Sequence, residues 1–155
     1  MQWQPALNHG VFQMMKALLD TDILSEVLKG RDPQVQRTAQ QYLSIFGRLT
    51  ISSVTIAEIV QGFQKARDER RLESFISSLE QNETLSLGIP EAALAGRIMG
   101  DLLRFGIPIG QMDPLIAATA MVNNLPLVTG NTRHFTRIID LGYPLELQNW
   151  RLPNG

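Results

Sequence analysis

The stretch Lys16-Ala17-Leu18-Leu19-Asp20-Thr21-Asp22 organises the rest of this 155-residue chain. It is a short apolar run that stops at two acidic residues spaced two positions apart. We predict that the run is the first and central strand of an α/β domain and that its acids lie where the strand ends. Aspartate is also favoured at the start of a helix, so either acid could instead cap the helix that follows. Asp22 is the stronger candidate for that cap, because it directly precedes the apolar pair at 23–24.

The composition is that of one folded domain with its own core, since 44% of the residues are hydrophobic. A net charge of −1 provides no overall field that would attract nucleic acid, so such binding would need a local patch. The chain has no cysteine, which excludes a disulfide framework and a thiolate zinc site and agrees with a cytoplasmic location. No apolar run reaches the roughly 18 residues of a membrane span. We expect an N-terminal extension at 1–14, one domain at 15–150 and a C-terminal tail at 151–155.

Strand-like apolar runs alternate with helical periods along the chain. Further strands are predicted at 49–51, 84–87, 126–129 and, at an edge, 145–147. Helices are predicted at 23–30, 33–47, from 53 or 55 to 63, 72–79, 90–106 and 113–122, and a short helical turn is predicted at 132–138. The buried face of the helix at 90–106 is expected to contain Ala92, Ala95, Gly96, Met99 and Leu102. This alternation indicates a parallel sheet covered on both faces, in which ligands lie outside the carboxyl ends of the strands.

Asp20, Glu58 and Asp113 are lone acids in apolar surroundings, and each follows a strand or opens a helix. Carboxylates gathered at one sheet edge repel one another, by about 4 kcal/mol for two unit charges roughly 4 Å apart at an effective dielectric near 20. A divalent cation would offset that repulsion. Oxygen ligands without cysteine and with little histidine favour Mg²⁺ or Mn²⁺ over zinc. Such ions suit phosphodiester hydrolysis, because they activate water and stabilise the leaving oxygen.

Two of these acids also have a purely structural interpretation. Glu58 lies three residues after Thr55, which is the spacing of a capping box. Asp113 precedes Pro114 and an apolar helix, which is the pattern of a helix N-cap. For Asp113 the two roles are compatible, because one carboxylate oxygen can accept a backbone N–H while the other faces a cation.

Four stretches together resemble the PIN domains of VapC-type toxins from toxin–antitoxin pairs, in the order and spacing of that family. They are Leu18–Glu26, Val54–Ile59, Asp113–Ala120 and Leu127–Phe135. The resemblance spans residues 15 to about 150. It implies a PIN-like three-layer α/β/α sandwich around a central, mostly parallel sheet, and a metal-dependent endoribonuclease.

By this resemblance Asp20, Glu58 and Asp113 match the family's core metal-binding acids, with Glu58 acting directly or through a water molecule. The fourth motif departs from the family, because it offers Asn131, and His134 where aspartate is common. Asn131 can bind a cation through its carbonyl oxygen but brings no charge, which leaves a one-metal site open. We interpret His134 as a partly exposed helical residue rather than a base. Supporting roles are expected for Thr21, Asp22 and Thr129, and phosphate contact for Arg133.

The resemblance also implies partners. Such toxins usually form homodimers and are blocked by a small VapB-type antitoxin that packs along a helical groove and covers the acids. By analogy we expect the groove along the helices at 54–79. The basic residues at 65, 67, 70 and 71 are interleaved with acids at 68, 69 and 73, a pattern that favours a solvated, salt-bridged helix face over an RNA contact or an antitoxin groove.

Two other classes of function stay open. The departure in the fourth motif is compatible with a PIN-like module that binds RNA or an antitoxin without cleaving. The stretch 20–22 also resembles the first motif of haloacid-dehalogenase-type phosphatases, with Asp20 as nucleophile and Asp22 as acid. That chemistry, like that of a response-regulator receiver, needs a late lysine, whereas the lysines here are Lys16, Lys29 and Lys65.

Overall fold

The structure is a computed structural model that describes residues 13–153, so most of the predicted N-terminal extension and residues 154–155 lie outside the described part. Within that part the sheet has five strands in the order β3-β2-β1-β4-β5, and every neighbouring pair is parallel. The strands are β1 (Leu18–Leu19), β2 (Thr50–Ser52), β3 (Glu83–Leu85), β4 (Leu127–Val128) and β5 (Leu147–Gln148). The predictions of a central first strand and of a final edge strand are confirmed.

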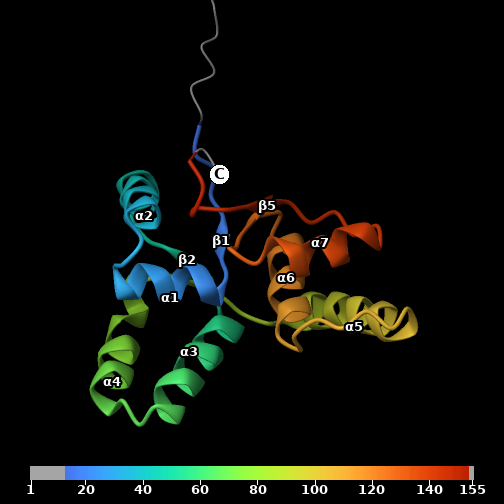
Figure 1. Ribbon diagram of the computed structural model, residues 1–155, viewed down its shortest axis with the longest axis horizontal. Helices are drawn as coiled ribbons and strands as arrows, with labels where there is room; N and C mark the ends of the chain where they lie inside the picture. The colour runs from blue at the N-terminus through green and yellow to red at the C-terminus, as the bar shows by residue number, and fades with distance from the viewer. Residues whose placement is uncertain (1–12, 154–155) are drawn as a thin grey trace, which may run out of the picture.

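Helices cover both faces of the sheet. They are α1 (Thr21–Lys29), α2 (Pro33–Phe46), α3 (Ser53–Lys65), α4 (Glu69–Ser78), α5 (Ile89–Arg104), α6 (Asp113–Val122) and α7 (Thr132–Asp140), with a 3₁₀ turn at Leu79–Gln81. Successive side chains of a strand point to opposite faces, and β1 shows this directly. Leu19 packs with residues of α1, α2 and α4, whereas Leu18 packs with residues of α5, α6 and α7. Figure 1 shows the two groups on either side of β1, which confirms the three-layer α/β/α sandwich.

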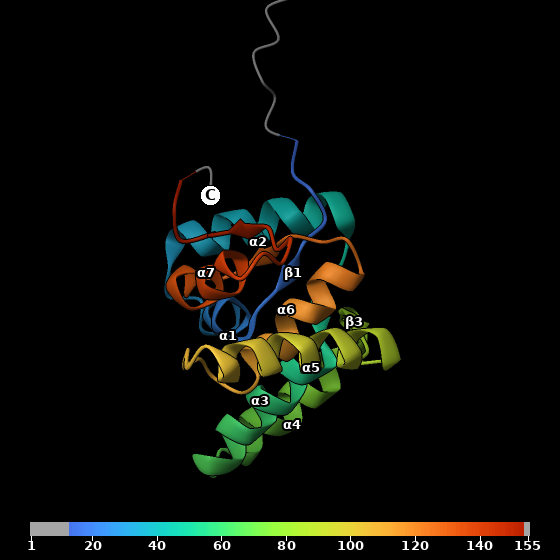
Figure 2. The ribbon, with the colours of Figure 1, turned by 90° about the vertical axis from the view of Figure 1, so that its right-hand side faces the viewer.

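Local signals in the sequence set several helix boundaries as predicted. The Asp32 side chain accepts hydrogen bonds from the backbone N–H groups of Gln34 and Val35, with Pro33 in the first turn. Gly30 and Gly47 end α1 and α2 with φ of 68° and 77°, a conformation that glycine adopts without strain. Beyond these helices, α3 and α4 extend away from the sheet side by side, as both views of the ribbon show (Figures 1 and 2).

The buried face of α5 agrees with the prediction only in part. The structure buries Ala95, Ile98 and Leu102, while Ala92 and Gly96 are exposed. Small and apolar residues of α5 lie on several sides of the helix, so its sequence allows more than one apolar stripe. Packing against α6 selects the stripe that contains Ile98. Among residues 13–153, no helix combines the length and the apolar character that crossing a membrane requires.

A buried tyrosine joins α2 to the sheet. The hydroxyl of Tyr42, a fully buried residue, accepts a hydrogen bond from the backbone N–H of Ala17 at 3.3 Å and lies 2.8 Å from the hydroxyl of Thr50. Its ring packs against that of Trp150, with centroids 5.5 Å apart. These contacts hold the N-terminal ends of β1 and β2 in place.

Tyr42→Phe is therefore expected to lower the free energy of unfolding by about 1–3 kcal/mol, because it leaves buried polar groups of Ala17 and Thr50 without this partner. Urea denaturation monitored by circular dichroism measures the change. Tyr143→Phe is the matched control, since Tyr143 is only partly buried and its hydroxyl bonds the Asp101 carboxylate. An equal loss in both variants would contradict the structural role of Tyr42.

Candidate active site at the carboxyl edge of the sheet

Asp20 leaves the sheet at the point where β1 ends. Its backbone N–H still bonds the Val128 carbonyl of β4, at 3.0 Å. Its carboxylate then accepts the backbone N–H of Ile23 at 2.9 Å and caps α1. Preference for Asp22 as the cap was therefore wrong, because Asp22 lies inside the first turn. Asp20 is only 4% exposed, so the carboxylate that caps α1 is buried inside the protein.

The surroundings of Asp20 disfavour its charged form. Burial raises the pKa of this carboxyl to about 7, although hydrogen bonds from the Thr129 side chain and the Ile23 backbone act in the opposite direction. The negative charges of Asp22 and Asp113 raise the pKa of Asp20 further. Asp20 and Asp113, which are 93 positions apart in the chain, are thus electrostatic neighbours at one edge of the sheet.

Asp113 opens α6 without capping it. Met112 occupies the cap position in an already helical conformation, and no side chain caps this helix. The alternative interpretation of Asp113 as a helix N-cap is therefore wrong. Its carboxylate instead lies 3.5 Å from Nδ1 of His134 on α7. Burial raises the pKa of the Asp113 carboxyl, whereas the contact with His134 lowers it.

The fourth motif forms the junction between β4 and α7. The Asn131 side-chain Nδ2 lies 2.8 Å from His134 Nδ1, which is hydrogen-bonding distance, so Asp113 at 3.5 Å is a charged neighbour of the same ring nitrogen. The Asn131 backbone N–H bonds the Thr129 hydroxyl at 2.9 Å, and Thr129 is fully buried. His134 is partly exposed on a helix, as predicted, but it also contacts a candidate metal ligand. Arg133 is exposed on α7.

Glu58 reaches the site from α3 through a threonine. The Thr21 hydroxyl, in the residue after Asp20, lies 2.6 Å from Glu58 Oε1 and 3.1 Å from the Thr55 hydroxyl. Ser52 caps α3 by accepting the Thr55 backbone N–H at 3.1 Å. The capping-box interpretation of Glu58 is therefore wrong, because the cap of the helix is Ser52, three residues before Thr55. The Glu58 carboxylate is directed to the start of α1 instead.

Asp22 is paired with a residue that the sequence did not single out. Its carboxylate lies 3.1 Å from the guanidinium of Arg151, which also lies 3.7 Å from Glu26 and 3.5 Å from Asp32. Arg151 is in the segment expected to be a tail, 129 positions after Asp22. A separation of this size leaves no local signal in the sequence.

The donor atoms at this edge suit a hard cation. Asp20, Asp113 and Glu58 offer carboxylate oxygens, and the first two repel each other at a largely buried position. Hard divalent ions prefer such ligands. Within residues 13–153, however, no three acidic or histidine side chains lie close enough together to hold a metal ion as they stand. The assignment of all three acids to one ion stays a prediction.

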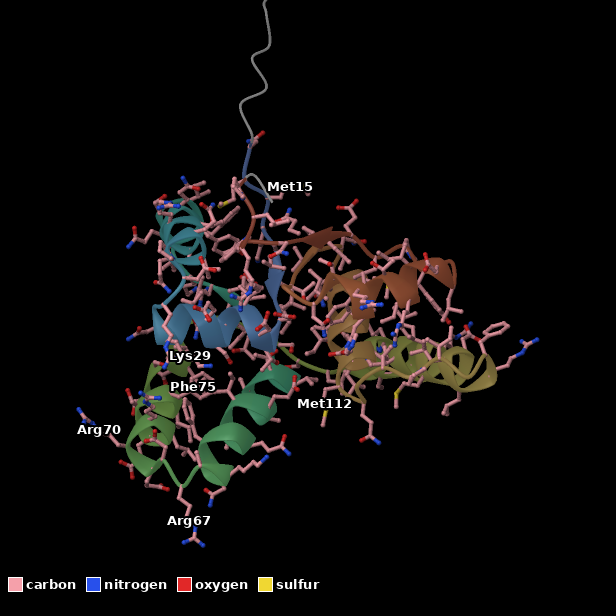
Figure 3. All side chains as sticks on the ribbon, viewed as in Figure 1. Met15, Lys29, Arg67, Arg70, Phe75 and Met112 are labelled. Carbon is pink, nitrogen blue, oxygen red and sulfur yellow. The ribbon has the colours of Figure 1, made fainter. Side chains whose placement is uncertain are left out.

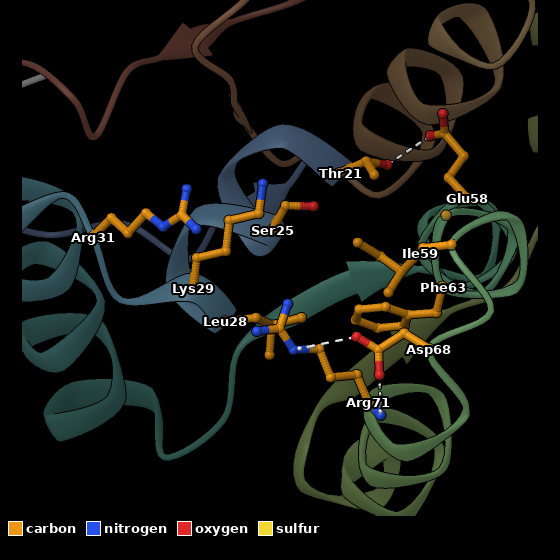
Figure 4. Close-up of a pocket in the computed structure, with 12 residues that line it drawn as sticks. Thr21, Ser25, Leu28, Lys29, Arg31, Glu58, Ile59, Phe63, Asp68 and Arg71 are labelled. Carbon is orange, nitrogen blue, oxygen red and sulfur yellow. Dashed lines mark hydrogen bonds and ion pairs between the residues drawn. The ribbon is translucent and has the colours of Figure 1, made fainter.

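A cavity of about 500 Å³ lies beside Glu58, between α1 and the α3–α4 pair. Figure 4 shows Thr21 and Glu58 joined at one end of it, with Leu28, Ile59 and Phe63 below them. The cavity is where the groove was expected, although α1 supplies the second wall. The basic residues at 65, 67, 70 and 71 belong to the same α3–α4 pair. Arg67 and Arg70 project into solvent (Figure 3), whereas Arg71 pairs with Asp68 at 3.5 Å.

Comparison with known proteins identifies the family. The model of the PIN domain matches residues 17–141. The chain belongs to the PIN domain family. One relative is the tRNA(fMet)-specific endonuclease VapC of Shigella flexneri, which is 33% identical over 81% of this chain and 93% of that protein. Another is ribonuclease VapC2 of Haemophilus influenzae, which is 34% identical over 88% of this chain and 99% of that protein.

Solved PIN structures agree with the fold. The DNA-bound VapBC complex of Salmonella typhimurium contains a chain that matches with a TM-score of 0.74 and 30% identity, over 88% of this chain and 99% of that one. VapBC-1 of nontypeable Haemophilus influenzae gives a TM-score of 0.69 and 29% identity over 89% and 100%. The resemblance to VapC-type PIN domains is confirmed, whereas Arg151 lies beyond the residues that the family model matches.

Proposed function

We propose that this PIN-domain protein is an endoribonuclease toxin of the VapC type, which hydrolyses phosphodiester bonds of RNA and is neutralised by a cognate antitoxin. The observation that supports it most is the buried Asp20 carboxyl, which lies at the end of the central strand beside the charge of Asp113. Such a pair is unfavourable by itself and becomes favourable with a divalent cation. Two relatives, one named a tRNA(fMet)-specific endonuclease and one named a ribonuclease, are 33% and 34% identical and favour RNA as the substrate.

The proposed cofactor is one Mg²⁺ or Mn²⁺ ion. Asp20 and Asp113 would hold it, with Glu58 as a direct or water-mediated ligand and the Asn131 carbonyl oxygen as a further donor. When bound, it supplies a Lewis acid that activates water and stabilises the leaving oxygen. The protein's own contribution is orientation, because the backbone N–H of Ile23 fixes the Asp20 carboxylate and the Thr21 hydroxyl fixes that of Glu58.

An RNA-cleavage assay tests this proposal. Purified protein free of antitoxin is incubated with structured RNAs in Mg²⁺, Mn²⁺ or EDTA, beside Asp20→Asn and Glu58→Gln. Initiator tRNA is the first substrate to try, because the Shigella flexneri relative is named for it. We expect cleavage that needs the cation and both carboxylates. Cleavage that survives EDTA, or equal cleavage by the variants, would overturn the metal-nuclease proposal.

The same assay separates the alternatives. Tight RNA binding without cleavage of any RNA would favour the binding module over the nuclease. The phosphatase alternative has lost its support, because the PIN family model spans all four motifs and the late lysine is missing.

The proposed macromolecular partners are RNA, a second copy of the chain and a VapB-type antitoxin. We place the antitoxin in the cavity between α1 and α3, whose apolar floor opens next to Glu58. A segment seated there would cover Glu58 and the Thr21 hydroxyl that bonds it. The neighbouring structures that are VapBC complexes support a VapB-type partner.

Gly62→Arg tests the groove. Gly62 lines the cavity, and a Cβ built on it meets no atom within 4 Å, so the larger side chain can enter the groove without disturbing the core. We expect antitoxin affinity to fall by on the order of 100-fold, with RNA cleavage retained. Gln61→Arg, the adjacent exposed position outside the cavity, is the control. Titration calorimetry with the antitoxin measures both, and equal affinities would place its binding elsewhere.

A further inference from the structure

Arg151, near the C-terminus, contacts three segments of the chain beside the candidate site. The Arg151 guanidinium lies within 3.1–3.7 Å of carboxylates from the first turn of α1, its second turn and the residue that caps α2. The backbone of Arg151 is held in place by the preceding residue, because Trp150 is buried against Tyr42. The Arg151 backbone N–H also bonds the side-chain oxygen of Asn149 at 3.0 Å. Arg151 is thus an anchored cation facing three anions.

Gly130, a glycine in the fourth motif, leaves room for the Asp22–Arg151 ion pair beside the backbone. A Cβ built on Gly130 would lie 2.5 Å from Asp22 Oδ2 and 2.8 Å from Arg151 Nε. These distances are shorter than side chains tolerate, so the Asp22–Arg151 pair lies directly against the backbone of Gly130. The residues on either side of Gly130 are Thr129, which bonds Asp20, and Asn131, which contacts His134.

We propose that Arg151 is a positioning residue of the ribonuclease site: it pairs with the Asp22 carboxylate, holds it against Gly130 and thereby fixes the turn that positions Thr129 beside Asp20 and Asn131 beside His134. This inference rests on the proposed function. It assigns Asp22 to the Arg151 pair rather than to the cation. Arg151 lies beyond residue 141, where the family model ends, whereas Asp22 and Gly130 lie within the match.

The electrostatic reason lies in the charges around Asp20. The charge of Asp22 acts on Asp20 in addition to that of Asp113. Arg151 offsets the charge of Asp22 at 3.1 Å. Without it, an unpaired carboxylate remains beside the site and the turn at Gly130 loses the group that packs on it. Because the side chains of Asp22 and Arg151 are 47% and 33% exposed, the pair adds little to global stability.

The test compares Arg151→Ala, Arg151→Lys, Asp22→Asn and the double variant Asp22→Asn/Arg151→Ala. Arg151→Ala is expected to lower kcat for RNA cleavage about 10-fold at unchanged KM, as removal of an outer partner of a metal site does. Its melting temperature should stay within about 3 °C of wild type. Arg151→Lys should recover most of the activity. The double variant should cleave better than Arg151→Ala, because the unpaired charge is gone.

A readout independent of cleavage keeps the two proposals apart. Hydrogen exchange of the Asn131 backbone N–H, which bonds the Thr129 hydroxyl, should become faster in Arg151→Ala and return toward wild type in Arg151→Lys. If wild-type protein cleaves no RNA but this exchange pattern holds, the proposed function fails while the positioning role survives. Unchanged exchange overturns the positioning role. So does unchanged kcat with a large fall in melting temperature, which marks a purely structural tie. A raised KM that persists in the Asp22→Asn background also overturns it, by making Arg151 a phosphate contact.

Discussion

Asp20→Asn is expected to stabilise the folded protein by about 2–4 kcal/mol at pH 8 in EDTA while abolishing RNA cleavage. The two effects have one cause. The protein buries a carboxyl whose charge is unfavourable without a cation, and asparagine removes the charge while keeping an oxygen for the Ile23 backbone N–H. Residues that favour function over stability are common at active sites.

The dependence on pH has a definite sign. Burial raises the pKa of Asp20 from 3.8 to about 7 in the folded protein, so the folded state holds a proton that the unfolded chain has already released. The contribution of Asp20 to stability is therefore present below about pH 4 and is lost as the pH rises through 7. Asparagine does not titrate, so the stability difference between variant and wild type should grow over that range.

Urea denaturation of both proteins in EDTA, from pH 4 to pH 8, measures this difference. Added Mn²⁺ should then stabilise the wild type and leave Asp20→Asn almost unchanged, because ligand binding to the folded state raises stability by mass action. A variant that is less stable than the wild type at pH 8 would show that the Asp20 charge is already compensated without a cation.

Asp113→Asn is expected to reduce kcat/KM for RNA cleavage by on the order of 100-fold or more with little change in the fold. Asp113 makes no helix-capping bond, so the substitution removes charge without removing a cap. An asparagine there still offers an oxygen to His134. Steady-state cleavage of a labelled RNA at saturating Mn²⁺ measures the loss.

Asp101→Asn is the matched control for that measurement. Asp101 lies on α5, is also partly exposed, and accepts its hydrogen bond from Tyr143 away from the acids of the site. It is expected to keep wild-type activity. Equal losses in the two variants would mean that Asp113 acts through general stability or charge rather than at the site.

The fold could be predicted because its signals are local. The cap and proline at 32–33 and the glycine at 47 lie next to the residues whose conformation they set. The alternation of strands and helices indicated a parallel sheet, and four motifs in order indicated its family. The face of α5 was less predictable, since packing against α6 chose among several apolar stripes.

The roles of individual polar residues depended on where the sheet ends. Asp20 and Asp22 are equally good caps by residue type, and the hydrogen bond from Asp20 to Val128 decides that the chain leaves the sheet at Asp20. In the same way, pairing of β2 with β3 extends to Ser52, so Ser52 rather than Thr55 caps α3. Boundaries of this kind require the partner strand to be known.

Contacts between distant segments gave no signal at all. Thr21 and Glu58 are 37 positions apart, and Asp22 and Arg151 are 129 apart. Residue type could nominate Glu58 as a ligand, but only the fold shows that a threonine hydroxyl orients it. It could not show that Asp22 is already paired.

The central claim is that Asp20 and Asp113 bind one divalent cation at the carboxyl edge of the sheet. Anomalous X-ray scattering from crystals soaked in Mn²⁺ tests it most directly, because the signal locates the ion itself. We predict one peak per chain within about 2.5 Å of carboxylate oxygens of both residues, and no such peak in Asp20→Asn. A peak elsewhere, or none in protein that cleaves RNA in the same Mn²⁺, would contradict the account.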